Sequence, residues 1–238
     1  MRVAIYGGSF NPIHKGHTTL ANAICRMGLV DEVWLMISPL NPLKQDDQQH
    51  ILPAFQRITL ARIATAPFRR LHVSDFELTL PTPSYTATTL EYLEAVWPTH
   101  RFALLMGEDN WRSFHQWYRA DYIRTHHPLI VYARPPGPVA GRQGSAARPD
   151  SVGREQGSAK RPPCLAKGLV TVHHPDGSVQ TLNHPGLQLL PVSSTQIRQA
   201  IRSGDEPFLR QWLHAGVRRY ILRHGLYRDL SSPGSETP

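Results

Sequence analysis

The stretch Gly7-Gly8-Ser9-Phe10-Asn11-Pro12-Ile13-His14-Lys15-Gly16-His17 follows a short apolar run, Val3–Tyr6, and precedes a helical pattern that begins near Thr18. Adjacent glycines let the backbone turn tightly and approach a ligand closely. A helix behind such a turn offers unpaired N–H groups and the positive end of its dipole, which suit a phosphate. The segment therefore predicts a strand, a phosphate-binding turn and a helix.

Two histidines, His14 and His17, lie three residues apart at this helix entrance, so both rings can face the same bound anion. Gly16 between them keeps Cβ bulk away from the phosphates. The dinucleotide fingerprint G-x-G-x-x-G is absent, and a glycine turn alone is shared by many nucleotide-binding folds. The plain alternative for the two histidines is a surface pair or a helix cap.

The rest of the chain alternates strand-like apolar runs with amphipathic helical runs, as in a parallel sheet covered by helices. Strands are predicted at Val3–Tyr6, Glu32–Ile37, Leu71–Val73, Phe102–Met106, Leu129–Ala133, Leu169–Val172 and Gln188–Pro191. Helices are predicted at Thr18–Met27, Ala54–Ala66, Tyr85–Val96, Thr195–Arg202, Pro207–His214 and Val217–His224. The fold class is therefore α/β, with a Rossmann-like parallel sheet flanked by helices.

Residues 135–168 interrupt this alternation, since they are rich in Gly, Pro, Ser, Ala and Arg and have no apolar period. Such a stretch inside a compact domain is typical of a disordered insertion or a mobile lid. We therefore expect one domain over residues 1–230, interrupted by this insertion, and a flexible tail over residues 231–238.

The composition suits a protein that stays reduced in the cytoplasm. No apolar run reaches the ~18 residues that cross a bilayer, and the amino terminus turns to glycine too soon for a secretory signal. Cys25 and Cys164 have no partner spacing for zinc or a redox pair. The net charge of +8 and the pI of 9.9 suggest polyanionic partners. However, residues 134–168 hold seven basic and two acidic residues, five of those eight charges.

The glycine and histidine segment resembles the signature of the HxGH nucleotidyltransferases, a superfamily with a Rossmann-like sheet. In that superfamily the two histidines contact the phosphates of ATP and stabilise charge on the pentacovalent transition state. The resemblance implies that His14 and His17 are catalytic and that a substrate phosphate attacks the α-phosphorus of ATP in line. Such a reaction needs positioning and charge stabilisation rather than a protein nucleophile.

Four further segments resemble the bacterial nicotinate-nucleotide adenylyltransferases, in particular the branch with Asn after the Phe. Many relatives carry Asp where this chain has Asn11, and many carry a histidine before the lysine of the Ser38–Lys44 loop, which this chain lacks. The segments Met106–Trp111 and Val192–Arg198 complete the ATP side. The resemblance implies these ATP-binding residues: Gly7, Gly8, Ser9, Phe10, Lys44, Gly107, Asp109, Ser193, Ser194, Thr195 and Arg198.

The segments Pro83–Leu90 and Trp117-Tyr118 carry the acceptor side of the resemblance. Ser84 is predicted to cap a helix, which leaves N–H groups at the helix entrance for a small carboxylate. In the family this entrance receives the carboxylate of the nicotinate ring, which implies a role for Thr86. The resemblance also implies that Trp117 stacks on the pyridine ring and that Tyr118 lies beside the carboxylate.

We expect the chain to join the AMP part of ATP to nicotinate mononucleotide and to release pyrophosphate, with Mg²⁺ accompanying ATP and no metal site in the protein itself. Another HxGH transferase, such as a pantetheine-phosphate or FMN adenylyltransferase, is the nearer alternative. A non-enzymatic RNA-binding protein is the further one, and it leaves two phosphate motifs unexplained. We expect no membrane partner, and the sequence leaves a homo-oligomer open.

Overall fold

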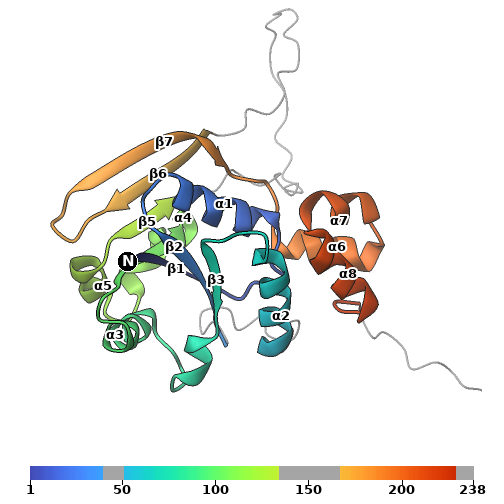
Figure 1. The fold of residues 1–238 in the computed structure, drawn as a ribbon, viewed down its shortest axis with the longest axis horizontal. Coiled ribbons are helices and arrows are strands. Elements are labelled where there is room, and N and C mark those ends of the chain that lie inside the picture. Colours follow the sequence, from blue (N-terminus) through green and yellow to red (C-terminus); the bar gives the residue numbers. More distant parts are fainter. Residues whose placement is uncertain (40–50, 134–166, 229–238) are drawn as a thin grey trace, which may run out of the picture.

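The computed structural model describes residues 1–39, 51–133 and 167–228 of the chain. Within these ranges one sheet has the strand order β3-β2-β1-β4-β5-β6-β7 (Figure 1). The first five positions of that order are parallel neighbours, whereas β6 is antiparallel to both β5 and β7. The predicted Rossmann-like sheet is confirmed, with an antiparallel hairpin added at one edge. The strands are β1 (Arg2–Gly8), β2 (Glu32–Ile37), β3 (Leu71–Ser74), β4 (Arg101–Gly107), β5 (Leu129–Tyr132), β6 (Lys167–His173) and β7 (Val179–Gln188).

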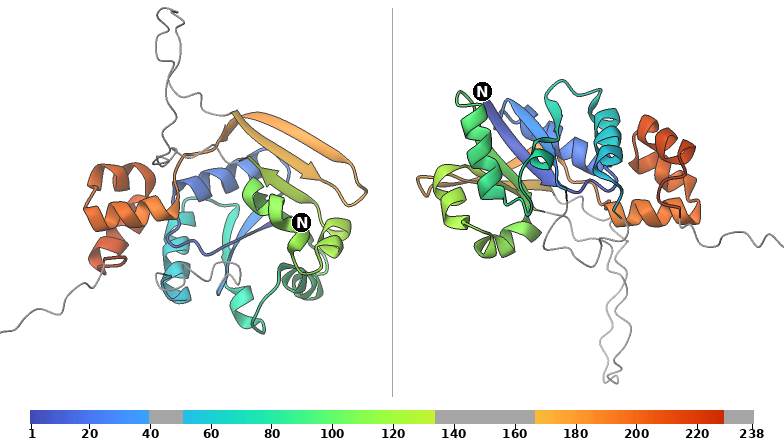
Figure 2. Two further views of the ribbon diagram at one scale, coloured as in Figure 1. Left: turned by 180° about the vertical axis from the view of Figure 1, so that it is seen from behind. Right: turned by 90° about the horizontal axis from the view of Figure 1, so that it is seen from below.

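Helices cover both faces of the sheet because β1 is apolar on both sides. Val3 and Ile5 pack in a core with α3 and α5, whereas Ala4 and Tyr6 pack in a second core with α1, α2 and α6. Figure 2 shows the sheet between these two layers. The helices are α1 (Lys15–Arg26), α2 (Ala54–Thr65), α3 (Thr86–Val96), α4 (Glu108–Ser113), α5 (Ala120–His126), α6 (Ser194–Ser203), α7 (Glu206–Trp212) and α8 (Ala215–Arg223), with 3₁₀ turns η2 (Phe76–Thr79) and η3 (Phe114–Gln116).

The helices α6, α7 and α8 gather at one end of the molecule, on the side opposite the β6–β7 hairpin (Figure 1). The first turn of α1 holds them in place. Lys15 Nζ donates to the carbonyl oxygens of Arg210 and Gln211 at 3.1 and 2.7 Å, and Thr18 Oγ1 lies 2.8 Å from His214 Nε2. The C-terminal helices are therefore anchored directly beside the predicted phosphate-binding segment.

Three parts of the sequence prediction need correction. The strand predicted at Gln188–Pro191 is wrong, because β7 instead runs from Val179 to Gln188. β7 is the last strand of the sheet and pairs only with β6, so it tolerates polar residues and shows no apolar run. β6 begins at Lys167, so the last two residues of the predicted insertion 135–168 lie in a strand. The short helices α4 and α5 were not predicted.

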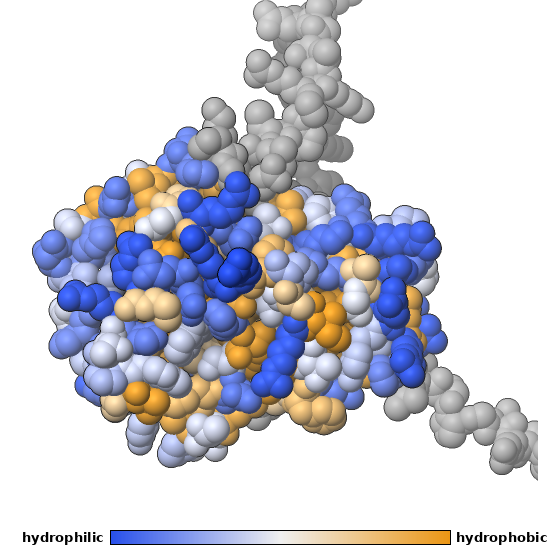
Figure 3. Space-filling model, viewed as in Figure 1, coloured by the Kyte–Doolittle hydropathy of each residue, from blue (hydrophilic) through white to orange (hydrophobic). Residues whose placement is uncertain are grey.

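The molecular surface mixes hydrophilic and hydrophobic side chains over the face seen in Figure 3. Among the residues that the structure describes, no helix is both long and apolar enough to span a membrane.

Candidate functional site

The strands β1 and β4 are neighbours in the sheet, although the chain forms β2 and β3 between them. In open α/β sheets, ligands bind beyond the carboxyl ends of the strands at such a reversal of strand order. β1 ends at Gly8 and β4 ends at Gly107. The predicted glycine turn and the predicted Gly107–Asp109 segment therefore lie at the same edge of the sheet, where the fold favours a ligand.

The turn after β1 is held by the aromatic ring of Phe10. This residue has a positive φ of 44°, which is unusual for a side chain with a Cβ, and it is only 3 % exposed. Its ring makes edge-to-face contacts with Tyr6 at 5.5 Å and with His17 at 5.1 Å. Since the ring lies in the core, any contact of Phe10 with ATP comes from its main chain.

The two histidines lie face to face at the start of α1, with ring centroids 3.8 Å apart. His14 is the residue before the helix, and its backbone N–H donates to His17 Nδ1 at 3.2 Å. A ring nitrogen that accepts a hydrogen bond carries no proton, so in neutral His17 the proton is on Nε2. The capping contact therefore leaves His17 with an Nε2–H group that can donate to an anion.

Gly16 is required for a reason that the sequence did not reveal. A Cβ at this position would lie 2.9 Å from the ring of His14 and 3.1 Å from Cγ1 of Val192. The expected reason was space for phosphates, but the structure shows close packing of His14 against the start of the Val192–Arg198 segment. The two predicted phosphate motifs, which are far apart in the sequence, are therefore in contact.

Hydrogen bonds fix this contact. Ser194 Oγ donates to the carbonyl oxygen of Pro12 at 3.0 Å, and Arg198 Nη1 donates to that of Asn11 at 2.8 Å. Ser193 caps α6, since its Oγ accepts from the Gln196 N–H at 3.2 Å. Arg198 is only 7 % exposed, and through its hydrogen bond to Asn11 its guanidinium fixes the turn that carries the histidines. Its direct contact with phosphates stays a prediction.

Asn11 joins three distant segments through one oxygen atom. Its Oδ1 accepts from the backbone N–H of Leu52 at 3.1 Å and from the hydroxyl of Tyr227 at 2.9 Å. Burial raises the pKa of Tyr227, which keeps this hydroxyl protonated as a donor. Asn11 is 3 % exposed. Because a carboxylate oxygen accepts in the same way, an Asp at this position can make the same two contacts.

A buried tyrosine pair from β1 and β5 and an exposed carboxylate lie beside the end of β4. Gly107 pairs with Tyr132 of β5, whose hydroxyl oxygen lies 3.1 Å from that of Tyr6. A Cβ at Gly107 would collide with Oδ1 of Asp109, so this carboxylate folds back over the glycine. Because Gly107 has no Cβ, the Asp109 carboxylate can occupy the space beside the ends of β1 and β4.

The two segments predicted to bind the acceptor meet at the start of α3, through the rings of Tyr85 and Tyr118. The helix begins at Thr86 with Tyr85 before it, so the predicted cap at Ser84 is wrong by one residue. The rings of Tyr85 and Tyr118 lie 4.8 Å apart, and both are exposed. Trp117 packs against Phe114 at 5.5 Å, and its buried Nε1–H has no hydrogen-bond partner among the described residues.

Comparisons with known proteins agree with this arrangement. Residues 5–200 match the model of the cytidylyltransferase-like family. A protein of Bacteroides thetaiotaomicron named "probable nicotinate-nucleotide adenylyltransferase" is 35% identical over 224 residues, which cover 94% of this chain and 92% of that protein. One of Rhizobium meliloti with the same name is 41% identical over 65% of this chain and 80% of its own. The chain belongs to the nicotinate-nucleotide adenylyltransferase family.

Solved structures of related enzymes have the same fold as this chain. Plasmodium falciparum nicotinic acid mononucleotide adenylyltransferase, complexed with NaAD, superposes with a TM-score of 0.65 at 18% identity. The match covers 95% of this chain and 97% of that one. Fold, family and enzyme class are thus as the sequence predicted.

The structure does not describe every residue that the family resemblance implied. Lys44 lies outside the described residues. Thr195 is exposed at the start of α6. Arg57 and Glu77 were not anticipated, although both are buried polar residues close to the predicted site. Only Arg57 had a sequence signal, because it lies on the same helical stripe as the apolar residues Ala61 and Ala64.

Proposed function

We propose that this chain transfers the adenylyl group of ATP to nicotinate mononucleotide, giving nicotinate adenine dinucleotide and pyrophosphate. The observation that carries the proposal is the contact between the two phosphate motifs, made by Ser194 with Pro12 and by Arg198 with Asn11. A single motif suits any phosphate. Two motifs that meet at the switch point of the sheet suit a polyphosphate donor.

The proposed chemistry is one in-line displacement. A phosphate oxygen of nicotinate mononucleotide forms a bond to the α-phosphorus of ATP as the bond from that phosphorus to the bridging oxygen of the β-phosphate breaks. Negative charge grows on the oxygens around the α-phosphorus and on the leaving pyrophosphate. His17 Nε2–H and His14 are proposed to stabilise the first charge, and the start of α6 the second.

The acceptor is proposed to bind where α3 begins. The backbone N–H of Thr86 and the region of Tyr118 would receive the nicotinate carboxylate, and Trp117 would stack on the pyridine ring. The contact between Tyr85 and Tyr118 supports this proposal, because their ring centroids lie 4.8 Å apart, which joins the two segments at the molecular surface. ATP is proposed to enter as its Mg²⁺ complex, because Mg²⁺ is commonly bound through substrate phosphates with few protein ligands. The proposed place of the reaction is the cytoplasm.

Pyrophosphate release tests the proposal. The purified chain is incubated with MgATP and, in separate reactions, nicotinate mononucleotide, nicotinamide mononucleotide, phosphopantetheine or FMN. Nicotinate mononucleotide should give the highest kcat/KM, and the dinucleotide product should accumulate in a one-to-one ratio with pyrophosphate. Higher kcat/KM with phosphopantetheine or FMN would reject the proposed acceptor while keeping the nucleotidyltransferase class.

A further inference from the structure

A buried arginine, Arg57 of α2, holds three loops at the carboxyl edge of the sheet. Its side chain is 1% exposed. Nη1 donates to the carbonyl oxygens of Ser9 and Ser38 at 2.8 and 2.9 Å, Nη2 to that of Pro39 at 3.2 Å and Nε to that of Leu52 at 2.9 Å. The guanidinium therefore connects the phosphate-binding turn to the loop after β2.

A second set of buried contacts continues from Ser38 toward α3. The Ser38 side chain is hydrogen-bonded to the carboxyl group of Glu77, which is 8% exposed. Thr89 Oγ1 lies 3.1 Å from Glu77 Oε1 and 3.2 Å from the carbonyl oxygen of Tyr85, the residue before α3. Burial is the largest cause and raises the pKa of Glu77, against the smaller opposing effect of the hydroxyl groups of Ser38 and Thr89. Thr89 lies one turn beyond Thr86.

Together these contacts form a continuous polar path from the phosphate-binding turn to the start of α3. We infer that Arg57, Ser38, Glu77 and Thr89 are positioning residues that set the nicotinate-nucleotide site at a fixed place relative to the phosphate-binding turn. This inference rests on the proposed function. In-line transfer depends on the alignment of the attacking oxygen with the α-phosphorus, so a small shift between the two sites lowers the rate even when each substrate still binds.

The test is steady-state kinetics of Thr89→Val, Glu77→Gln and Arg57→Lys in the full chain, with ATP and nicotinate mononucleotide each varied. Each substitution keeps side-chain size or charge: Thr89→Val removes a hydroxyl, Glu77→Gln replaces one acceptor oxygen with a donor, and Arg57→Lys removes part of the guanidinium hydrogen bonds. We expect kcat to fall about tenfold, because misalignment by a fraction of an ångström is costly. Each KM should change by no more than about twofold, as for an interaction that matters only in the transition state.

The matched control is Thr65→Val. Thr65 is also a buried helical threonine, and its Oγ1 donates to a carbonyl oxygen four residues earlier, that of Ala61, at 2.9 Å. It is not part of the path, so its loss should leave kcat unchanged. Melting temperatures of all variants establish that the assay compares folded proteins. Glu77→Gln changes almost no volume, so the test stands even if Arg57→Lys does not fold.

The double variant Arg57→Lys/Thr89→Val decides whether the two ends act as one unit. For one path, the second substitution should add little to the first, so the loss should stay close to that of the worse single variant. Losses that multiply, or a Thr89→Val variant with unchanged kcat, would overturn the inference. If the wild-type chain instead prefers another phosphate acceptor, the proposed function fails, and the same variants are then measured with that acceptor.

Discussion

The two ends of the proposed site are built in different ways. At the phosphate end, His14, Asn11 and Arg198 are buried, and hydrogen bonds join Asn11 and Arg198 to distant segments. At the acceptor end, Tyr85 and Tyr118 are 41% and 53% exposed, and their rings contact each other at a tilt of 37°. The phosphate end is therefore preorganised by the fold, whereas the acceptor end has side chains that can adjust to a ligand.

This difference separates the functions of the two ends. Groups that are fixed before the substrate arrives stabilise a transition state without reorganisation, so they affect kcat. Exposed aromatic groups contribute contact area that substrate and transition state share, so they affect KM and the choice of substrate. Substitutions at the two ends should thus have distinct kinetic signatures.

The largest effect is expected from the histidines. His14→Ala or His17→Ala should lower kcat by ~10²–10³, the usual contribution of a positioned donor to a transition state. The measurement is kcat at saturating MgATP and nicotinate mononucleotide. A folded variant with near-normal kcat would remove that histidine from the mechanism.

His17→Asn distinguishes catalysis from helix capping. The amide oxygen of Asn can replace Nδ1 as the acceptor of the His14 N–H, but Asn has nothing in place of Nε2–H. If the Nε2–H group is catalytic, His17→Asn should be as inactive as His17→Ala while it melts closer to the wild type. Recovery of kcat in His17→Asn would instead assign His17 to capping alone.

The next largest effect is expected at the acceptor end. The kcat/KM for nicotinate mononucleotide should exceed that for nicotinamide mononucleotide at least tenfold. A carboxylate pairs with N–H donors, and a mismatched amide costs about 1–3 kcal/mol for each polar group left unsatisfied. Equal kcat/KM values for the two substrates would reject the proposed carboxylate site.

Thr86→Pro sharpens that prediction, with Thr86→Ala as its control. Thr86 is the first residue of α3, a position that accepts proline, and Tyr85 before it has the extended backbone that proline requires. The proline removes the N–H proposed to bind the carboxylate together with the threonine hydroxyl, and Thr86→Ala removes the hydroxyl alone. We expect Thr86→Pro to raise the KM for nicotinate mononucleotide and to weaken the preference, while Thr86→Ala keeps both.

The phosphate end was predictable from sequence because its residues are local. Glycines, histidines and hydroxyls within two short segments define the start of α1 and of α6, and the 3.6-residue period locates both helices. The contact between Gly16 and Val192 was not predictable, since nothing local relates positions so far apart. The packing reason for Gly16 was therefore missed, and its role in leaving space for phosphates stays a prediction.

The polar path and β7 show what local patterns miss. Arg57 and Arg62 lie on the same helix, yet one is buried among carbonyl oxygens and the other is exposed. The apolar stripe of α2 places Arg57 on the buried side, but only tertiary packing reveals the carbonyl oxygens that it contacts. For β7, the apolar residues Leu189 and Leu190 led to a strand prediction that begins where the observed strand ends. The polar residues Gln180 and Thr181 belong to the strand because β6 supplies their backbone partners.

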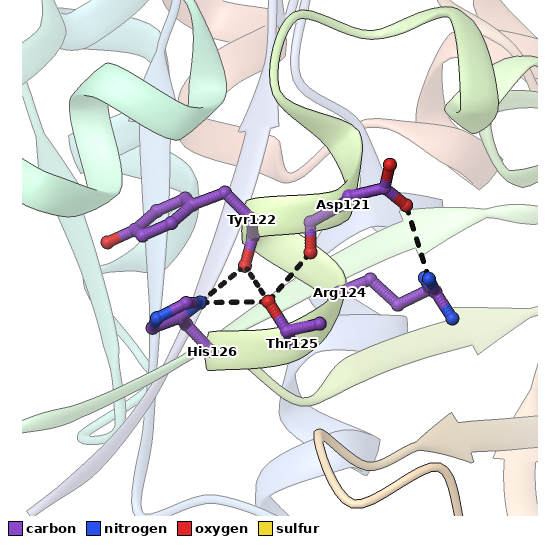
Figure 4. A network of polar contacts seen from close by, with 5 residues as sticks. All are labelled: Asp121, Tyr122, Arg124, Thr125 and His126. Atoms are coloured by element: carbon purple, nitrogen blue, oxygen red, sulfur yellow. Dashed lines mark hydrogen bonds and ion pairs between the residues drawn. The ribbon is translucent and has the colours of Figure 1, made fainter.

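A smaller effect is expected from pH, through the buried His127, which follows α5 and lies beside the start of β4. This histidine is 1% exposed, its Nδ1 lies 3.2 Å from the carbonyl oxygen of Phe102, and Glu94 is 3.8 Å away. Burial, the largest cause, lowers the pKa of His127, against smaller opposing effects of Glu94 and of the hydrogen bond to Phe102. The neighbouring His126 is bonded to the Tyr122 carbonyl and the Thr125 hydroxyl (Figure 4).

A folded-state pKa below the unfolded value means that the unfolded chain takes up the proton first. The contribution of His127 to the free energy of unfolding is therefore complete above about pH 6.5. It is lost as the pH falls below that value, by at most about 1.4 kcal/mol per pH unit for one proton. Urea unfolding between pH 8 and 5 measures this loss. His127→Asn keeps an amide donor for Phe102 and does not titrate, so its profile should be flatter. An unchanged slope would assign the loss to other groups.

The smallest effect is expected from replacing residues 137–166 with a short Gly/Ser linker. The strands that flank this segment are antiparallel neighbours, with Tyr132 opposite Val170 and the Ala133 N–H bonded to the Leu169 carbonyl at 3.1 Å. A short linker can therefore join them, and the change in loop-closure entropy is only ~1 kcal/mol. The replacement removes none of the residues assigned to either end of the site, so kcat and melting temperature should barely move.

The opposite view treats the arginines of this segment as a lid that grips the phosphates of ATP. In that case the replacement would raise the KM for ATP strongly, and most at low ionic strength, where exposed charges act furthest. A full-length variant with Ser at Arg142, Arg148, Arg154, Lys160 and Arg161 separates charge from length, because it keeps the segment and removes its basic residues. A large, salt-sensitive rise in KM for ATP in both variants would make the segment part of the phosphate end. Unchanged KM values would leave that end to the buried contacts around His14, Asn11 and Arg198.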